Sequence, residues 1–167
     1  QDLRNKVADK LKDNYHVEIG MRYGQPSIKT GLDQLIEKGA TSIKILPLYP
    51  QYAMSTTESS IKEAYRCLKG LTNPLPVEII PPFYNQPGFI KSFASLARET
   101  LQKNSLDHII FSFHGLPENH LLKTEGRKGF CGHYDTCCKT ISKDNKNCYR
   151  AQCLATARSL TQELGLE

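Results

Sequence analysis

The stretch Ile109-Ile110-Phe111-Ser112-Phe113-His114-Gly115-Leu116-Pro117 decides the expected fold of this chain. Its β-favouring apolar residues predict a strand that ends at one histidine, because Gly-Leu-Pro interrupts the pattern at once. Open α/β sheets bind ligands beyond the carboxyl ends of their strands, where the His114 imidazole can accept a proton or ligate a metal. From this segment alone, a histidine that packs at a turn and donates one hydrogen bond is an equally good interpretation.

Strands and helices are expected to alternate along the rest of the chain. Apolar alternation and short apolar runs ended by Gly or Pro predict strands at 16–23, 42–49 and 77–80. Helical spacing predicts helices at 2–13, 26–39, 55–68, 87–103 and 149–164, with inward residues that include Phe93, Leu96 and Leu154. A capping box at Ser55 to Glu58 is expected to open the third helix. This order predicts an α/β fold, a three-layer α/β/α arrangement around a mostly parallel sheet of about four strands.

Composition narrows the classes of function. The 167 residues are 39% hydrophobic with a net charge of +5, which suits one domain with a real core but not two. The basic residues are scattered, which favours an anionic ligand or peripheral contact with an acidic membrane surface over nucleic-acid binding. No apolar run approaches the length of a membrane span, and no secretory signal is recognisable.

Polar and aromatic residues follow each predicted strand. They are Arg22 with Tyr23, Tyr49 to Tyr52, Pro81 to Tyr84, and His114. The carboxyl ends of parallel strands share one edge of a sheet, so these groups are expected to converge on one crevice. Aromatic walls with one cation and one imidazole suit a flat, apolar ligand that carries carboxylates. A helix start at Ser55 and Thr56 adds amides and a dipole that favour anions.

Three of these stretches, in this order and at this spacing, closely resemble the ferrochelatase family. They are Arg22-Tyr23, the run LYPQYAMSTTESS from Leu48 to Ser60, and FSFHGLP from Phe111 to Pro117. The resemblance implies a chelatase-like fold and a cytoplasmic enzyme that inserts ferrous iron into protoporphyrin IX, the last step of haem biosynthesis. In that family pattern, His114 matches the essential active-site histidine. Arg22 and Tyr23 match residues of the porphyrin cleft, and Tyr52, Ser55 and Thr56 match the second strand-end loop.

The chemistry of metallation agrees with this resemblance. Inserting the metal removes two pyrrole protons, so the site needs a base with a pKa near neutral and a wall that distorts the macrocycle. His114 is the histidine expected at a strand tip, where it would take protons or hand over iron. The family's first strand and its second α/β domain are not recognised in this chain. Residues 1–167 are therefore interpreted as a single partial chelatase-like domain that lacks full activity alone.

The segment 118–148 departs from the family's usual connection by roughly twenty extra residues. Five of the six cysteines fall between Cys131 and Cys153, at spacings that match no common zinc-finger pattern. Four thiolates from an irregular loop suit an iron–sulfur cluster, and the segment resembles the internal insertion of bacterial ferrochelatases that carry a [2Fe-2S] cluster. The ligands expected are Cys131, Cys138, Cys148 and Cys153, with Cys137 as the substitute for Cys138.

Other interpretations of the cysteines and of the whole chain stay open. Structural zinc is the alternative to the cluster, His133 is a lesser candidate ligand, and disulfides do not suit a reducing cytosol. The polar segment offers few apolar groups, so a metal cross-link is the expected reason for its order. The alternative functions are a non-catalytic tetrapyrrole-binding or iron–sulfur redox-sensing module, and a cobalt or nickel chelatase. The Tyr-Pro-Gln-Tyr run from Tyr49 to Tyr52 favours a ferrochelatase over a cobalt or nickel chelatase. The sequence does not predict the oligomeric state.

Overall fold

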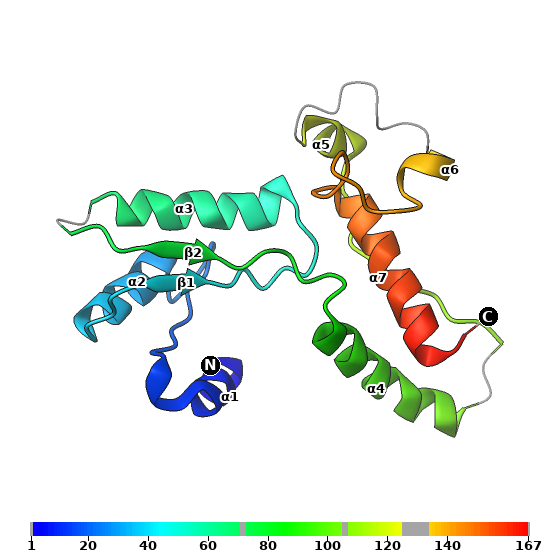
Figure 1. Cartoon of the computed structure of the whole chain (residues 1–167), viewed down its shortest axis with the longest axis horizontal. Helices are drawn as coiled ribbons and strands as arrows, with labels where there is room; N and C mark the ends of the chain where they lie inside the picture. The colour runs from blue at the N-terminus through cyan, green and yellow to red at the C-terminus, as the bar shows by residue number, and fades with distance from the viewer. Residues whose placement is uncertain (1, 71–72, 105–106, 125–133, 167) are drawn as a thin grey trace. The chain divides into compact units, whose positions relative to one another are not determined.

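A computed structural model describes residues 2–70, 73–104, 107–124 and 134–166 (Figure 1). The chain separates into two compact units. Unit 1 contains Gln1–Leu48 and Ser55–Pro81, and unit 2 contains Tyr49–Met54 and Pro82–Glu167. The chain therefore leaves unit 1 twice, first for the short Tyr49–Met54 segment and finally after Pro81.

Unit 1 is built on a two-stranded parallel sheet. Strand β1 (Ile43–Ile45) pairs with β2 (Val77–Ile79), with Ile43 opposite Val77 and Ile45 opposite Ile79. Parallel strands need a long crossover between them. That crossover contains the π-helical turn η2 (Met54–Glu58) and helix α3 (Ser59–Leu68), which lies alongside the strands in Figure 1.

The remaining elements of unit 1 precede the sheet. Helix α1 (Asp2–Leu11) continues into the 3-10 turn η1 (Lys12–Asn14), and α2 (Ile28–Glu37) packs against α3. Ser27 begins α2, because its hydroxyl accepts a hydrogen bond from the Thr30 amide at 3.0 Å. Gly39 follows the helix at a φ of +79°, a conformation that glycine adopts without strain.

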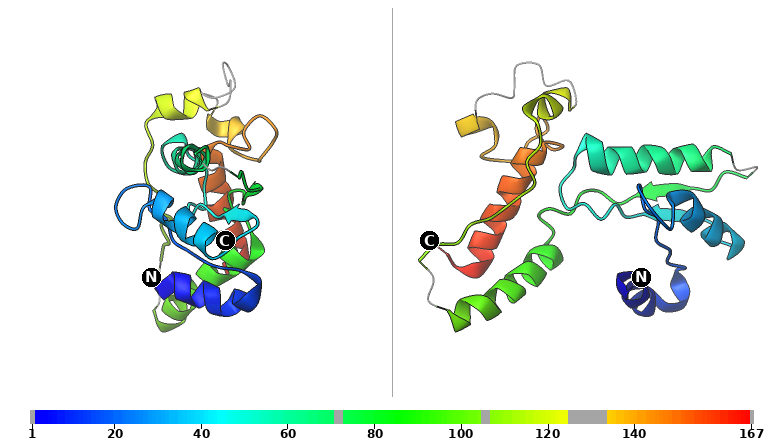
Figure 2. Two further views of the ribbon diagram at one scale, coloured as in Figure 1. Left: turned by 90° about the vertical axis from the view of Figure 1, so that its left-hand side faces the viewer. Right: turned by 180° about the vertical axis from the view of Figure 1, so that it is seen from behind.

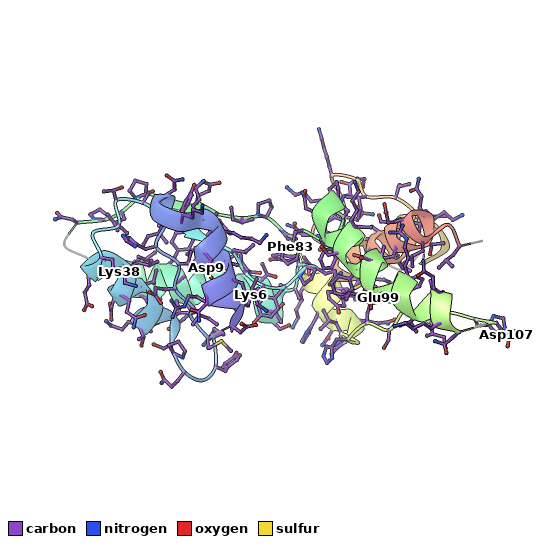
Figure 3. The ribbon with its side chains drawn as sticks, turned by 90° about the horizontal axis from the view of Figure 1, so that it is seen from below. Lys6, Asp9, Lys38, Phe83, Glu99 and Asp107 are labelled. Carbon is purple, nitrogen blue, oxygen red and sulfur yellow. The ribbon has the colours of Figure 1, made fainter. Side chains whose placement is uncertain are left out.

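Unit 2 is helical in its described residues. Helix α4 (Pro87–Lys103) packs against α7 (Tyr149–Leu164), and the two lie side by side in both views of Figure 2. The short helices α5 (Glu118–Lys123) and α6 (Tyr134–Cys137) lie between them in the chain. Phe83 lies beside the start of α4 in Figure 3, and its ring meets the Phe89 ring edge-on with centroids 5.3 Å apart.

The helix positions were predicted more accurately than the strands. The bounds of α4 and α7 agree with the sequence, whereas β1 and β2 are the two strands found in the described residues. The predicted strands at 16–23 and 109–114 are absent, apart from a single bridge between Met21 and Ser27. An apolar, β-favouring segment becomes a strand only where a neighbour completes its hydrogen bonds, and the described residues provide no such ladder. The expectation of about four strands is therefore not met within this part of the chain.

Three finer expectations about the helices are wrong. Ser55 does not cap α3, because the backbone coils as η2 before α3 begins, and Glu58 precedes α3 without a side-chain cap. On α4, Phe93 and Leu96 are 52% and 68% exposed. At 100° per residue they lie off the face that holds the buried Ile90 and Ala94. On α7, Leu154 is also exposed.

The described part of the cysteine-bearing segment has packing of its own, whereas a metal cross-link was expected to be the main reason for its order. Cys138, Cys148 and Ala151 form a small buried cluster with Ile141 against it. Asn145, which is 2% exposed, donates to the carbonyls of Cys137 and Thr140. One buried amide therefore supplies the hydrogen bonds that an irregular loop cannot make by itself.

The contact between α4 and α7 predicts which apolar residue of α4 matters for stability. Ile90→Ala is expected to lower the free energy of unfolding by about 2 kcal/mol, because it opens a cavity beside Ala94 and Leu160. Leu96→Ala, on the exposed side of the same helix, should stay within about 0.5 kcal/mol of the parent. Urea unfolding followed by circular dichroism measures both values. Equal losses from the two variants would contradict the assigned core face.

Candidate functional site

The predicted porphyrin contacts Arg22 and Tyr23 lie in a tight loop of unit 1. The Met21 amide donates to the Pro26 carbonyl at 2.7 Å and closes this loop. Arg22 Nε donates to Ser59 Oγ at the start of α3 at 3.0 Å, and its guanidinium carbon lies 4.7 Å from the Tyr23 ring centroid. The Tyr23 ring is 75% exposed. Arg22 is thus held from two sides, and Tyr23 offers an open aromatic face.

Ser55 and Thr56 lie in the π-helical turn that leads into α3. Ser55 is exposed and Thr56 is half-buried, while the neighbouring Thr57 is buried. The predicted site therefore presents hydroxyls along a coiled turn rather than at a capped helix N-terminus. Sequence reasoning did not identify Ser59, which follows directly and binds Arg22.

Tyr52 lies in unit 2, where α7 fixes its backbone. The Tyr52 amide donates to Gln152 Oε1 at 2.6 Å, and Gln51 Nε2 donates to Thr156 Oγ1 at 3.0 Å. Thr156 Oγ1 also lies 2.8 Å from the Tyr84 carbonyl oxygen and donates to it. Two of the segments predicted to share a crevice, around residues 51 and 84, are therefore brought together by α7.

His114 lies at the wall of a cavity of about 250 Å³ in unit 2. The segment before it is not paired as a strand, and the imidazole is exposed. The cavity is also lined by Phe113, Tyr149, Arg150, Cys153 and Leu154. A histidine, a phenol and a thiol are thus placed around one space, within a mainly apolar wall.

Tyr149 connects His114 to Cys153 across this cavity. Burial raises the pKa of Tyr149 to about 12, and the charge of Cys153 and a hydrogen bond with that thiol act in the same direction. A hydrogen bond from the His114 backbone opposes this increase. Burial likewise raises the pKa of Cys153 to about 11. Both groups are therefore neutral near pH 7, and the Tyr149 hydroxyl accepts a hydrogen bond from the main chain at His114.

The predicted cluster cysteines gather only in part. Cys138, Cys148 and Cys153 are 2%, 3% and 6% exposed. Cys137 Sγ lies 3.5 Å from Cys138 Sγ. Cys131 and His133 lie outside the described residues, and within the described ranges no three His, Cys, Asp or Glu side chains are grouped as a metal site. Cys67, on α3, instead points its thiol at Glu63, 3.6 Å away.

Burial also determines the acidity of Cys138. It raises the pKa of Cys138 to about 12, and the hydrogen bond and charge of Cys137 and the charge of Cys148 add to this effect. Bare thiolates at these positions would repel one another in a region with little water. A bound cation would offset this repulsion, so these cysteines are better suited to binding a cation than to remaining as free thiolates.

Some contributors to the site could not be selected from the sequence. Tyr149 appeared only as the start of a helix, and Gln152 and Thr156 as ordinary helix residues. Their signal is faint: polar residues at i and i+4 on the side of α7 that also contains Cys153 and Leu160. The predicted convergence of Arg22 and Tyr23 with His114 concerns residues of different units and stays a prediction.

Among the helices of the described residues, none combines the length and the apolar character that a membrane span requires.

These features define a helix-rich α/β protein with a small parallel sheet in one unit and a histidine-lined cavity in the other. The model of the ferrochelatase family matches residues 1–167, and the chain belongs to this family.

Individual relatives agree with the family match. The chain is 40% identical over 160 residues to the ferrochelatase of Bdellovibrio bacteriovorus, across 96% of this chain and 47% of that protein. The ferrochelatase of Coxiella burnetii is 40% identical over 166 residues, across 98% of this chain and 45% of its own length. That of Ectopseudomonas mendocina is 42% identical over 168 residues, across 98% and 49%. The chain spans about half the length of the curated relatives it matches.

The contrast between Cys137 and Cys138 gives a test of the site geometry. In metal-free native protein, iodoacetamide should label the half-buried Cys137 well before Cys138, whose thiol is buried and has a pKa raised to about 12. Cys153 should also be slow, because a pKa of about 11 leaves about one thiol in a thousand ionised at pH 8. Peptide mass spectrometry measures the rates, and unfolding in denaturant should equalise them. Native labelling of Cys138 as fast as Cys137 would contradict the burial described.

Proposed function

We propose that the protein containing this chain inserts ferrous iron into protoporphyrin IX to form protohaem. The observation that carries the proposal is the ferrochelatase family match over residues 1–167. The relatives described above all bear the name ferrochelatase, which favours iron over cobalt or nickel and an enzyme over a passive binding module. We place the protein in a reducing cytoplasm, where free thiols persist.

We assign the central role to His114. Metallation exchanges two pyrrole protons for one Fe²⁺ ion, so the charge balances without any oxidation or reduction. An exposed imidazole at a cavity wall can take up a pyrrole proton, or deliver the iron and release it to the ring. Support comes from the hydrogen bond between Tyr149 and the backbone at this position, since a positioned base acts only within hydrogen-bond reach of its substrate.

The remaining roles concern the porphyrin. The cavity of about 250 Å³ lies below the roughly 300–1,000 Å³ of small-molecule pockets, so it would admit the metal or one edge of the ring. Arg22 is proposed to bind a polar or carboxylate group of the porphyrin and Tyr23 to contact the ring face, which is consistent with its exposure. Tyr52, Ser55 and Thr56 are proposed to contact the same ligand from the loop that precedes α3.

We propose in addition that residues 1–167 are one chelatase-like domain with 118–148 as an insertion. In the complete sheet, the segments 16–23 and 109–114 would supply the third and fourth strands. Their β-favouring sequences support this arrangement, since such segments pair readily once a neighbouring strand is present.

The role of His114 is tested by iron insertion in the full-length protein. His114→Ala should lower kcat at least about 100-fold, because general acid–base groups contribute roughly 10²–10⁴-fold. His108→Ala is the matched control, since it removes another exposed imidazole of the same segment. Turnover of the His114 variant within a few-fold of the parent, without added imidazole, would remove this residue from the mechanism.

A second proposal concerns the cysteines: that they hold a [2Fe-2S] cluster. It is supported by the buried thiols of Cys138, Cys148 and Cys153 and by the raised pKa of Cys138, which a cation would reverse. Cys131 is proposed as the fourth ligand and Cys137 as the substitute for Cys138. The cluster would supply redox-active iron, whereas the chain's own residues hold the thiols in place.

Anaerobic purification tests the cluster. The protein is expected to be red-brown, with visible charge-transfer bands and about two irons per chain. Cys148→Ser and Cys153→Ser should each abolish the colour, because thiolates are the ligands, while Cys67→Ser on α3 should leave it unchanged. A colourless protein with one tightly bound zinc would replace the cluster by a structural zinc site.

A further inference from the structure

Helix α7 carries two buried polar side chains one turn apart. Gln152 is 1% exposed and Thr156 is 3% exposed. Buried amides and hydroxyls are costly unless they are hydrogen-bonded. Each of them bonds a backbone group from a segment far away in the sequence, the Tyr52 amide for Gln152 and the Tyr84 carbonyl for Thr156, which makes these two residues candidates for a positioning role.

Gln152 uses both ends of its amide. Its Oε1 accepts from the Tyr52 backbone N–H at 2.6 Å, and its Nε2 donates to the carbonyl of Lys146. The orientation of the amide is fixed by these partners, because an N–H requires the oxygen and a carbonyl requires the NH₂ group. One side chain thus joins the Tyr52 loop to the residues that precede Cys148.

The Lys146 carbonyl belongs to a compact segment, residues 137–148, which we call the cysteine segment. Asn145 ties it together: its Nδ2 donates to the Cys137 and Thr140 carbonyls at 2.6 and 2.7 Å. Its Oδ1 accepts from the Ser142 amide at 2.6 Å. Lys146 follows Asn145 directly, so a rearrangement of the backbone that Asn145 holds is expected to move the carbonyl that Gln152 binds.

Thr156 offers an internal comparison. Its hydroxyl accepts from Gln51 and donates to the Tyr84 carbonyl, so it holds the same loop at the residue before Tyr52. Neither of these bonds involves the cysteine segment. Thr156 would anchor the loop, whereas Gln152 would make it sensitive to the state of the cysteines.

We infer that Gln152 is a positioning residue that couples the cysteine segment to the backbone of Tyr52. When the cysteine segment is held in its native arrangement, the Gln152 amide is oriented to accept the Tyr52 N–H. When the segment loosens, the amide loses one of its two partners and with it the orientation that the Tyr52 bond needs. Only the consequence for porphyrin affinity rests on the proposed function.

The coupling is measured by a double-mutant cycle in the full chain. Asn145→Ala loosens the cysteine segment, and Gln152→Met removes the link with little change of shape. The readout is hydrogen exchange of the Tyr52 amide, relative to the Ala94 amide, which is fully buried on α4 and reports on global unfolding. Gln162→Met, at an exposed glutamine of the same helix, is the matched control.

The expected pattern is specific. Asn145→Ala should accelerate Tyr52 exchange about fivefold relative to Ala94, the size of one typical hydrogen bond. In the Gln152→Met background the same change should add less than about twofold, since the link is already gone. The inference is overturned if Asn145→Ala leaves Tyr52 at the parental rate, or accelerates it equally in both backgrounds.

A second variant keeps the test decisive if Gln152→Met unfolds. Gln152→Glu retains an acceptor for the Tyr52 amide, and above the pH at which its buried carboxyl ionises it loses the donor to Lys146. Tyr52 should then stay protected and become insensitive to Asn145→Ala. Persistent sensitivity would overturn the inference.

Titration with protoporphyrin IX separates this coupling from the proposed function. If Tyr52 contacts the porphyrin, Asn145→Ala should weaken binding only where Gln152 is intact. Absence of porphyrin binding by the parent would count against the proposed function, while the exchange pattern alone decides the coupling.

Discussion

The structure of unit 2 depends on one constraint: the buried amide and hydroxyl of α7 must find hydrogen-bond partners away from water. Gln152 and Thr156 meet it with the backbone of the Tyr52 loop, of Tyr84 and of the cysteine segment. An unpaired buried polar group costs roughly 1–3 kcal/mol, a large fraction of a small domain's stability. These bonds are directional, whereas the apolar contact of α4 with α7 rests on few buried residues. The apolar contact holds the helices together, and the hydrogen bonds decide where the loops lie.

This division explains which parts of the structure could be predicted from the sequence. The bounds of α4 and α7 follow from helical spacing and from Pro87 and Gly165 at their ends, all of which are local signals. Strands depend on a partner elsewhere in the chain. The segment before His114 has the composition of a strand and yet is unpaired in the described residues. Local propensity thus identified the segment but could not supply its neighbour.

The candidate site shows the same limit at the level of single residues. His114, Arg22 and Tyr52 were selected because their side chains have obvious chemistry. Gln152 was not selected, because a glutamine in a helix is ordinarily a solvated residue and nothing local indicates burial. Leu154 was expected in the core because a leucine at helical spacing is ordinarily buried. It is instead exposed and lines the His114 cavity. The face of α7 is set by which groups it must bind, and hydrophobic periodicity alone does not contain that information.

The cysteine segment combines both kinds of constraint. Asn145 holds the backbone through hydrogen bonds that need no metal, and thereby keeps Cys138 and Cys148 buried together. That burial raises the pKa of Cys138, so without a cation its thiol remains protonated and repulsion between neighbouring thiolates is avoided. Binding of a metal by the Cys138 thiolate would release that proton, which makes any metal affinity here weaken as the pH falls. A backbone that is already ordered lowers the entropy cost that binding a cluster would otherwise have to offset. The backbone that Asn145 orders is also the one to which Gln152 donates a hydrogen bond, at the Lys146 carbonyl.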